Sequence, residues 1–223
     1  MTPFDWQEGM NHRAQFAESR IAAGVPVVAY SLPEGIFFGT FRSQVRKVYE
    51  VYDRLIFTGI GMHSDIESIR VAAVDFAHQE GYQRSEDDVT IQRVVSALSN
   101  PVKKSFGDFQ VAPLSARCLF AEVNEDEEKD KFYTLDFDGD YEICRTCTVL
   151  AGTEEAKLLV RDLLESTKID MSSPVKVSTG VERALKKYLK EAEYDAAEFK
   201  FEAAIIQRAS SRKRRFQLLT PEE

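Results

Sequence analysis

The chain has 223 residues and a formal net charge of −8, and 43% of its residues are hydrophobic while 30% are charged. These values are typical of a globular protein with one sizeable core, and the negative charge argues against general binding to nucleic acid. No apolar run is long enough to cross a membrane, and the first residues lack the pattern of a signal peptide. An odd number of cysteines, 3 in all, favours a reducing cytoplasm over a disulfide framework.

The first predicted element is a helix over residues 5–23. Asp5 is a candidate N-cap, and Glu8 follows it at the spacing of a capping box. Gly24 and Pro26 are expected to end the helix. Its apolar residues form only a patchy stripe, which predicts a helix on the surface of the domain or in a contact between subunits.

Two predicted hairpins come next. The first joins a strand over residues 25–32 to a return strand over residues 36–41, through a turn at residues 33–35. The second hairpin lies within residues 46–60, where alternate positions carry apolar side chains that would share one face of a sheet. These side chains belong to Tyr49, Val51, Leu55 and Phe57.

Two helices are predicted after the hairpins, over residues 64–80 and 87–105. Gly59 and Gly61 allow a tight turn into the first of them. The second contains Pro101, which is expected to bend it or end it.

The second half of the chain again has strands followed by helices. An acidic loop separates the first two strands, and Asp138-Gly139 is a hairpin turn signal before the third. The expected strands cover residues 110–123, 131–137, 140–149 and 199–207, and the expected helices cover residues 153–168 and 174–193. This order predicts an α+β fold, a four-layer αββα sandwich of two antiparallel sheets flanked by helix pairs, with an extra N-terminal helix.

Patterns that could bind a metal ion or act in redox chemistry are weak. Cys144 and Cys147 have the CxxC spacing, but no second pair of zinc ligands accompanies them, and they lie in a predicted strand rather than at a helix start. Asp136, Asp138 and Asp140 resemble the start of a calcium loop that lacks its final glutamate. We expect structural roles for these residues, and no metal.

The remaining motifs are equally weak. His12, His63 and His78 are scattered, and Gly59 with Gly61 lacks the third glycine of a dinucleotide site. We therefore expect no cofactor. The basic run at residues 212–215 fits a solvated surface, a contact with an acidic partner or a flexible tail.

One segment carries a family resemblance. Residues 51–61, Val-Tyr-Asp-Arg-Leu-Ile-Phe-Thr-Gly-Ile-Gly, resemble α-type subunits of the bacterial proteasome core particle, which are non-catalytic members of the N-terminal-nucleophile hydrolase superfamily. Further similar segments follow the family's order along most of the chain. They lie at residues 22–30, 35–38, 71–82, 87–90, 150–153 and 203–216.

The resemblance provides a test for catalysis. In the catalytic β-type relatives, a freed N-terminal threonine at the start of the first strand is the nucleophile, and an aspartate and a lysine support it. In this chain Val25 stands in place of the threonine and Phe41 in place of the aspartate. Of the three catalytic residues only the lysine, Lys47, is kept. Thr2 does not replace the nucleophile, because it is followed by Pro3 and not by a first strand. The resemblance thus implies that the chain is not an enzyme.

The resemblance also implies roles for particular residues. Lys47 would lie in a pocket between neighbouring α subunits and pair with the C-terminal carboxylate of an activator's tail, and the alternative is a strand lysine in a surface ion pair. The first residues would form a gate, and the N-terminal helix would contact the next subunit. The gate residues are Met1, Thr2, Pro3, Phe4 and Asp5, and the contact residues are Trp6, Met10 and Phe16.

As a whole, the resemblance implies one domain over residues 1–223, with residues 1–24 as gate and helix and residues 208–223 as a basic tail. The expected function is that of a cytoplasmic, heptameric α-ring on a ring of β-type subunits. It would admit unfolded proteins and dock an AAA ATPase or another ring activator, with no nucleic acid or membrane as a partner. Two alternatives stay open: a divergent N-terminal-nucleophile hydrolase, and a ring-forming relative that acts without a β-type partner.

Overall fold

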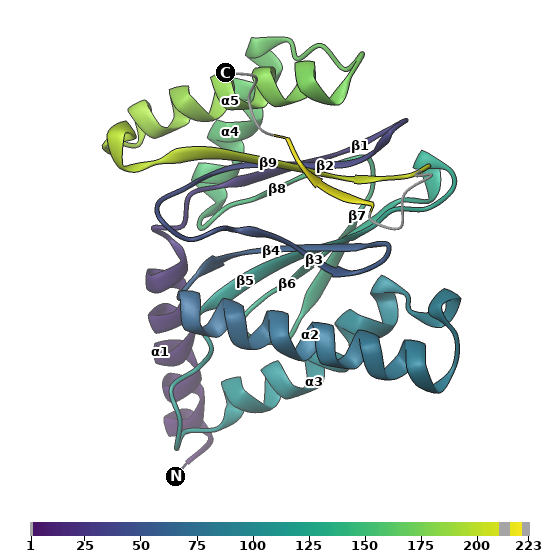
Figure 1. Ribbon diagram of the computed structural model, residues 1–223. Coiled ribbons are helices and arrows are strands. Elements are labelled where there is room, and N and C mark those ends of the chain that lie inside the picture. Colours follow the sequence, from purple (N-terminus) through teal and green to yellow (C-terminus); the bar gives the residue numbers. More distant parts are fainter. Residues whose placement is uncertain (1, 210–214, 220–223) are drawn as a thin grey trace.

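The computed structural model describes residues 2–209 and 215–219 of the chain. Two five-stranded antiparallel sheets are stacked face to face and covered by helices on both outer faces (Figure 1). The predicted α+β sandwich is therefore confirmed. Helices α2 and α3 cover one sheet, α4 and α5 cover the other, and α1 stands at one end of the sandwich (Figure 1). The helices are α1 (Pro3–Ile21), α2 (His63–Gln83), α3 (Ile91–Gly107), α4 (Glu154–Thr167) and α5 (Pro174–Glu191).

Sheet A has the strand order β10-β9-β2-β1-β8, and sheet B has the order β3-β4-β5-β6-β7. One edge of the sandwich is therefore formed by β10 and β3, and the other by β8 and β7. The strands of sheet A are β1 (Val27–Leu32), β2 (Gly35–Arg42), β8 (Cys147–Leu150), β9 (Lys200–Gln207) and β10 (Phe216–Leu218). The strands of sheet B are β3 (Val48–Tyr52), β4 (Leu55–Gly61), β5 (Ala116–Glu122), β6 (Lys131–Leu135) and β7 (Tyr141–Cys144).

The apolar side chains form three cores, one between the sheets and one under each helix pair. Alternation along the strands separates them, because successive side chains point to opposite faces. In the second hairpin, Val51, Leu55 and Phe57 belong to the core under α2 and α3, and Tyr49 packs against it. The prediction that these four residues share one face is confirmed.

Helix α1 begins earlier than predicted. Thr2, rather than Asp5, is the N-cap: its hydroxyl accepts the backbone N–H of Asp5 at 3.2 Å, and the Asp5 carboxylate accepts the backbone N–H of Thr2 at 2.7 Å. The capping box is thus real but shifted by three residues, with Pro3 at the first helical position, where its missing N–H costs nothing. These hydrogen bonds lower the pKa of Asp5.

The predicted strand over residues 140–149 is wrong. It is two strands, β7 in sheet B and β8 in sheet A, separated by a turn in which Thr146 has a φ of 69°. Strand-forming residues lie on both sides of the turn and neither glycine nor proline marks it, so the pattern alone does not reveal the change of sheet. The predicted strand over residues 110–123 is also too long, because residues 108–115 precede β5 as a loop.

Other boundaries differ by smaller amounts. Pro101 lies inside α3 without ending it, and a separate 3-10 turn at Glu86–Asp88 replaces the predicted start of that helix. Strand β10 was not predicted, because three residues after a basic run carry no periodic signal. Of the basic run, Arg212, Lys213 and Arg214 lie outside the described residues, and Arg215 pairs with Asp53 at 3.6 Å.

Candidate functional site

Lys47 lies immediately before β3, at the end of the sandwich where β1 starts. Its Nζ donates a hydrogen bond to the backbone carbonyl of Val25 at 2.7 Å and lies 3.4 Å from the hydroxyl of Thr40. The side chain is half-buried. Lys47 is therefore directed into the sandwich, towards the start of β1, rather than out into solvent.

A buried carboxylate holds the backbone at this point. Glu202, in β9, is only 6% exposed. It accepts the backbone N–H groups of Lys47 and Val48, each at 3.1 Å. It also pairs with Arg42 at 3.1 Å and more distantly with Arg46 at 4.0 Å. A buried charge is tolerated only when such partners compensate it, and these partners fix the connector between β2 and β3 onto sheet A.

The charge of Lys47 depends on two opposing influences. Burial lowers the pKa of Lys47 to about 8, while the negative charge of Glu202 acts in the opposite direction. The ammonium form therefore still predominates at neutral pH. The structure thus keeps a positive charge at the start of β3, although burial weakens its hold on the proton.

Lys47 opens onto a cleft of about 200 Å³. Two glycines shape its wall: a Cβ at Gly59 would lie 2.8 Å from the Ile66 side chain, and Gly61 has a φ of +117°, which favours glycine. Among the described residues, those that line the cleft include Arg46, Lys47 and His63 and no carboxylate. These lining residues are Gly24, Ser43, Val45, Arg46, Lys47, Tyr49, Gly59, Ile60, Gly61, His63 and Ile66. The cleft is therefore suited to a small anionic group.

The three positions that matter for catalysis in the β-type relatives are only partly brought together. Lys47 contacts the carbonyl of Val25, but Phe41 points into the core under α4 and α5, where its ring packs 5.2 Å from that of Phe201. The hydroxyl of Thr40, which lies 3.4 Å from the Nζ of Lys47, is buried and donates to the carbonyl of Pro26 at 2.8 Å. The Thr40 hydroxyl therefore already has a backbone partner.

The expected gate residues lie at the start of α1. Thr2 caps the helix, Pro3 to Asp5 form its first turn, and Phe4 is 85% exposed. Met1 lies outside the described residues. Three of these four residues are thus helical, whereas the sequence predicted a helix that begins at residue 5.

The expected contact residues lie further along the same helix. Trp6 and Phe16 are 46% and 43% exposed, and Met10 is half-buried. The C-terminal half of α1 is anchored, because Ala17 and Ile21 enter the core between the sheets. Arg13 also ties α1 to the end of α3 through the carbonyls of Phe106 at 2.7 Å and Ser105 at 3.0 Å.

The cysteines and aspartates singled out from the sequence lie at or near the edge formed by β7 and β8. Cys144 and Cys147 are free thiols at the edges of different sheets, one half-buried and one exposed. Asp136 pairs with Arg117 at 2.7 Å. Within residues 2–209 and 215–219, no group of three or more metal-ligating side chains is gathered. In the same part of the chain, no helix has the length and apolar character needed to cross a bilayer.

The family of the chain follows from comparison with known proteins. Residues 38–206 match the family described as "Proteasome subunit". The chain belongs to the proteasome subunit family. Within that family, the relatives it resembles are bacterial proteins named "Proteasome subunit alpha".

Three of these α-type relatives show the range of similarity. The Jonesia denitrificans protein is 30% identical over 148 residues, covering 66% of this chain and 62% of the relative. The Xylanimonas cellulosilytica protein is 34% identical over 132 residues, 58% of this chain and 54% of the relative. These matches thus span less than two thirds of the relatives' length. The Streptomyces avermitilis protein is 26% identical over 226 residues, covering 100% of this chain and 88% of the relative.

The sequence analysis singled out Lys47 as a candidate but missed the residues that hold it. Glu202 lies 155 positions away in the chain, and only the register of β2 with β9 brings it to the connector. A signal was nevertheless present: Glu202 is a carboxylate within the otherwise apolar run of β9. A buried charge in a central strand indicates a partner across the fold.

Proposed function

We propose that this chain is a non-catalytic α-type subunit of a bacterial proteasome core particle. It assembles in the cytoplasm into a heptameric ring with copies of itself, caps a ring of β-type subunits and gates the entry of unfolded proteins. The ring docks an AAA ATPase or another ring activator through the activator's C-terminal tails. The names of the relatives support the α-type assignment, and the cationic cleft at Lys47 is the observation that supports docking.

The cleft suits a terminal carboxylate for a chemical reason. An ammonium has three donors, and Lys47 directs one to Val25 and a longer, weaker one to Thr40. A donor therefore remains for a ligand. Glu202, which accepts hydrogen bonds from the connector, is already occupied by backbone N–H groups and Arg42, so it supports the cation without filling the cleft.

Replacing Lys47 tests the docking role. A partly desolvated, charge-assisted hydrogen bond contributes about 1.5–3 kcal/mol, so Lys47→Ala should weaken each tail roughly ten- to a hundredfold. Several tails bind one ring, and the loss of activation should therefore exceed the loss for a single tail. The measurement is degradation of an unfolded protein by reconstituted particles, with and without activator.

The matched control is Lys187→Ala, which removes an exposed lysine of α5. It should leave activation unchanged, and Lys47→Arg should restore part of it because the charge is kept but its shape differs. Small-peptide cleavage without activator should be the same in all particles. Normal activation of Lys47→Ala particles would overturn the docking role.

Two further parts of the proposal concern α1. Its exposed Trp6 and Phe16, together with Met10, support a contact between neighbouring subunits. Phe16→Glu should therefore release monomers on a sizing column, and persistence of intact rings would contradict the contact. For the gate, deletion of residues 1–6 should speed degradation by the complete particle, and an unchanged rate would place the gate elsewhere.

The absence of catalysis is supported by the surroundings of Lys47. A side-chain hydroxyl that lies near it, that of Thr40, is buried and hydrogen-bonded to the backbone, whereas a nucleophile must be free to attack. The purified chain should therefore show no peptidase activity. Covalent attachment of a threonine-directed inhibitor to any residue of this chain would favour the hydrolase alternative.

A further inference from the structure

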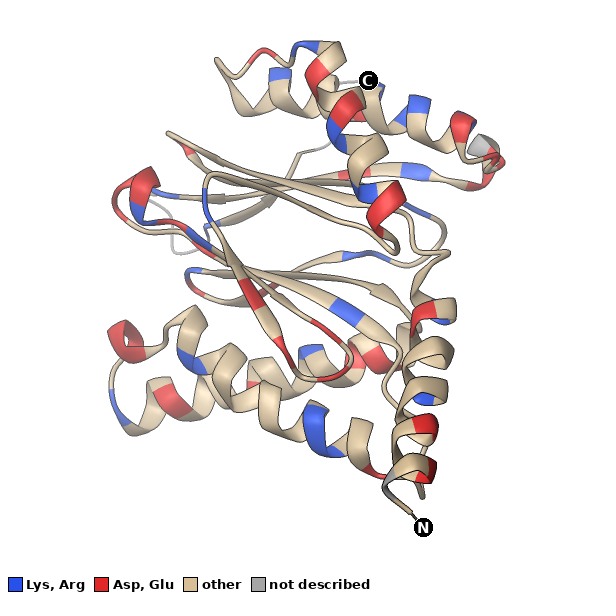
Figure 2. Cartoon of the chain, turned by 180° about the vertical axis from the view of Figure 1, so that it is seen from behind, with Lys and Arg blue, Asp and Glu red and all other residues tan. Residues whose placement is uncertain are grey.

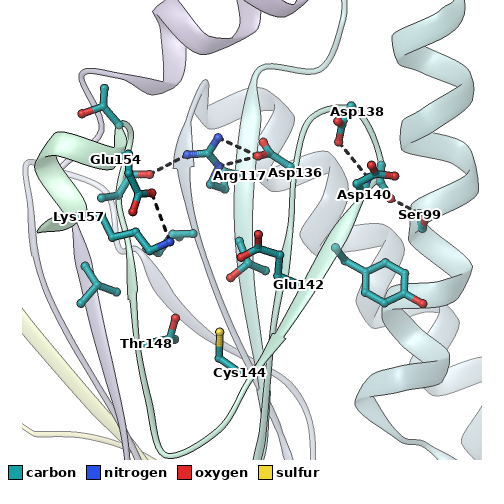
Figure 3. A pocket seen from close by; sticks show the side chains of 17 residues that line it. Ser99, Arg117, Asp136, Asp138, Asp140, Glu142, Cys144, Thr148, Glu154 and Lys157 are labelled. Carbon is teal, nitrogen blue, oxygen red and sulfur yellow. Dashed lines mark hydrogen bonds and ion pairs between the residues drawn. The ribbon is translucent and has the colours of Figure 1, made fainter.

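The two edges of the sandwich carry opposite charge. At the edge formed by β7 and β8 there is a cleft of about 550 Å³ (Figure 3). Figure 2 shows acidic residues gathered on the β6–β7 hairpin beside it. In the described part of the chain, the charged side chains that line the cleft are five carboxylates and two cations. They are Asp136, Asp138, Asp140, Glu142 and Glu154, with Arg117 and Lys157.

The two cations of the cleft are already paired. Arg117 binds Asp136 at 2.7 Å, and Lys157 lies 3.4 Å from Glu154. Asp138, Asp140 and Glu142 thus leave a net charge of three negative. Asp140 and Glu142 are exposed, and the Glu142 side chain points into the space between β7 and β8 (Figure 3).

The opposite edge has a basic projection. The connector between β2 and β3, residues 43–47, is exposed over its first four residues. The Arg46 side chain is 45% exposed and that of Arg42 is 28% exposed. With Lys47 they make three cations against the single buried carboxylate of Glu202, a net charge of two positive.

Both charged regions lie at the same end of sheet B. The pairing of β4 with β5 sets Gly61 opposite Ala116, and that of β5 with β6 sets Cys118 opposite Leu135. The acidic cleft begins beyond this last pair, and the connector enters β3 beside the same end of β4. Two copies placed side by side in the same orientation therefore bring a basic connector to an acidic cleft.

We propose that the β7/β8 cleft of one copy receives the β2–β3 connector of the next copy, so that Arg46 and Arg42 face Asp138, Asp140 and Glu142. The proposal rests on the ring of the proposed function and specifies which surfaces join. Such a head-to-tail contact is repeated by every copy and closes into a ring when the rotation allows it. The Lys47 cleft lies next to the connector, so its open side is completed by the neighbour.

Apolar side chains support the same contact. On the acidic edge, Tyr141 and Ile143 of β7 are 40% and 56% exposed, and on the basic edge Val45 is 48% exposed. A contact between the two edges would cover all three. Charge would then set the partner and register, and apolar burial would add stability.

Charge reversal tests the contact. Glu142→Lys and Arg46→Glu each place like charges together at every joint. Like-charge juxtaposition costs several kcal/mol, so each should raise the concentration at half-assembly roughly a hundredfold. The double variant restores one opposite pair at every joint and should assemble at a concentration near that of the unmodified chain. Sedimentation velocity over a concentration series measures the change, and Glu191→Lys, at an exposed position of α5, is the control with the same change in charge as Glu142→Lys.

The outcomes are distinct. Two disrupted single variants, a restored double variant and an unaffected control support the contact. Single variants that assemble normally, or a double variant that stays dissociated although its circular dichroism is unchanged, overturn it while leaving the proposed function intact. An unmodified chain that stays monomeric, alone and with a β-type subunit, overturns both.

Discussion

Two of the polar clusters that connect the sheets lie at opposite ends of the sandwich, and they differ in how completely their donors are used. Arg208 and Asp130 form a closed cluster: Asp130 is fully buried, and Arg208 contacts both of its oxygens, at 2.8 and 2.7 Å. Arg208 also donates to the carbonyl of Leu32 at 2.8 Å, and Ser31 donates to Asp130 at 2.6 Å. Lys47 and Glu202 form an open cluster that faces a cleft.

This difference distinguishes a cluster that only holds the fold together from a cluster that can bind a ligand. In the closed cluster, the described contacts occupy both partners, so nothing is left for a ligand and the role is to fix the 124–130 loop to sheet A. In the open cluster, the described contacts occupy Glu202, whereas those of Lys47 use two of its three ammonium donors, and Lys47 lines the cleft. We therefore expect mutations in the closed cluster to affect stability and mutations in the open cluster to affect binding.

The largest effect on folding is expected at Arg208. Arg208→Leu leaves the carboxylate of Asp130 buried without its cation, and breaking a buried pair in this way costs about 3–5 kcal/mol. Denaturant unfolding measures the loss. Arg208→Leu together with Asp130→Leu is the control and should recover much of it. A single variant within about 1 kcal/mol of the unmodified chain would show that the closed cluster is not structural.

A smaller effect is expected at Glu202. Glu202→Gln keeps hydrogen-bond acceptance but removes the charge that opposes the lowered pKa of Lys47, and should cost about 1–3 kcal/mol of stability. The pKa of Lys47 should fall further, because only burial then acts on it. Measurement of that pKa by NMR on lysine labelled with ¹⁵N checks the direction. An unchanged pKa would show that the charge of Glu202 does not act on Lys47.

The smallest effect on folding is expected at Lys47 itself. Lys47→Met should change stability at pH 7 by at most about 1 kcal/mol, since apolar replacement of a partly buried ion is often neutral. The folded chain binds this proton less tightly than the unfolded chain. The unmodified chain therefore gains stability as the pH rises from about 8 towards the ordinary value of 10.5. The variant should lack that gain in unfolding experiments, and equal pH profiles would contradict the lowered pKa.

The two clusters also show which parts of the structure could be predicted from the sequence. The alternation in residues 49–57 predicted a hairpin and its buried face, and the helix order predicted the layers, because these are local patterns. Lys47 was identified by its place in the family's order. Glu202 and the Arg208–Asp130 pair were missed, because partners 155 and 78 positions apart meet only through strand register.

The acidic cleft and the turn at Thr146 were missed for a related reason. Asp136, Asp138 and Asp140 were read only as a hairpin turn or a partial calcium loop, and their gathering with Glu142 and Glu154 depends on β7 and β8 belonging to different sheets. A continuous strand over residues 140–149 would have had no such cleft. Local alternation cannot show where a chain leaves one sheet for the other.

The most direct test of the docking role compares one tail peptide in two forms. A peptide from the C-terminus of a proteasome-activating ATPase is titrated, as the free acid and as the C-terminal amide, into assembled rings at pH 7 and pH 9.5. With a pKa of about 8 for Lys47, roughly 90% of its side chains are charged at pH 7 and only a few per cent at pH 9.5. The free acid should bind roughly ten- to a hundredfold more tightly than the amide at pH 7, lose that advantage at pH 9.5, and keep it at both values in Lys47→Arg rings. Equal affinities of acid and amide at pH 7 would contradict a carboxylate site at Lys47.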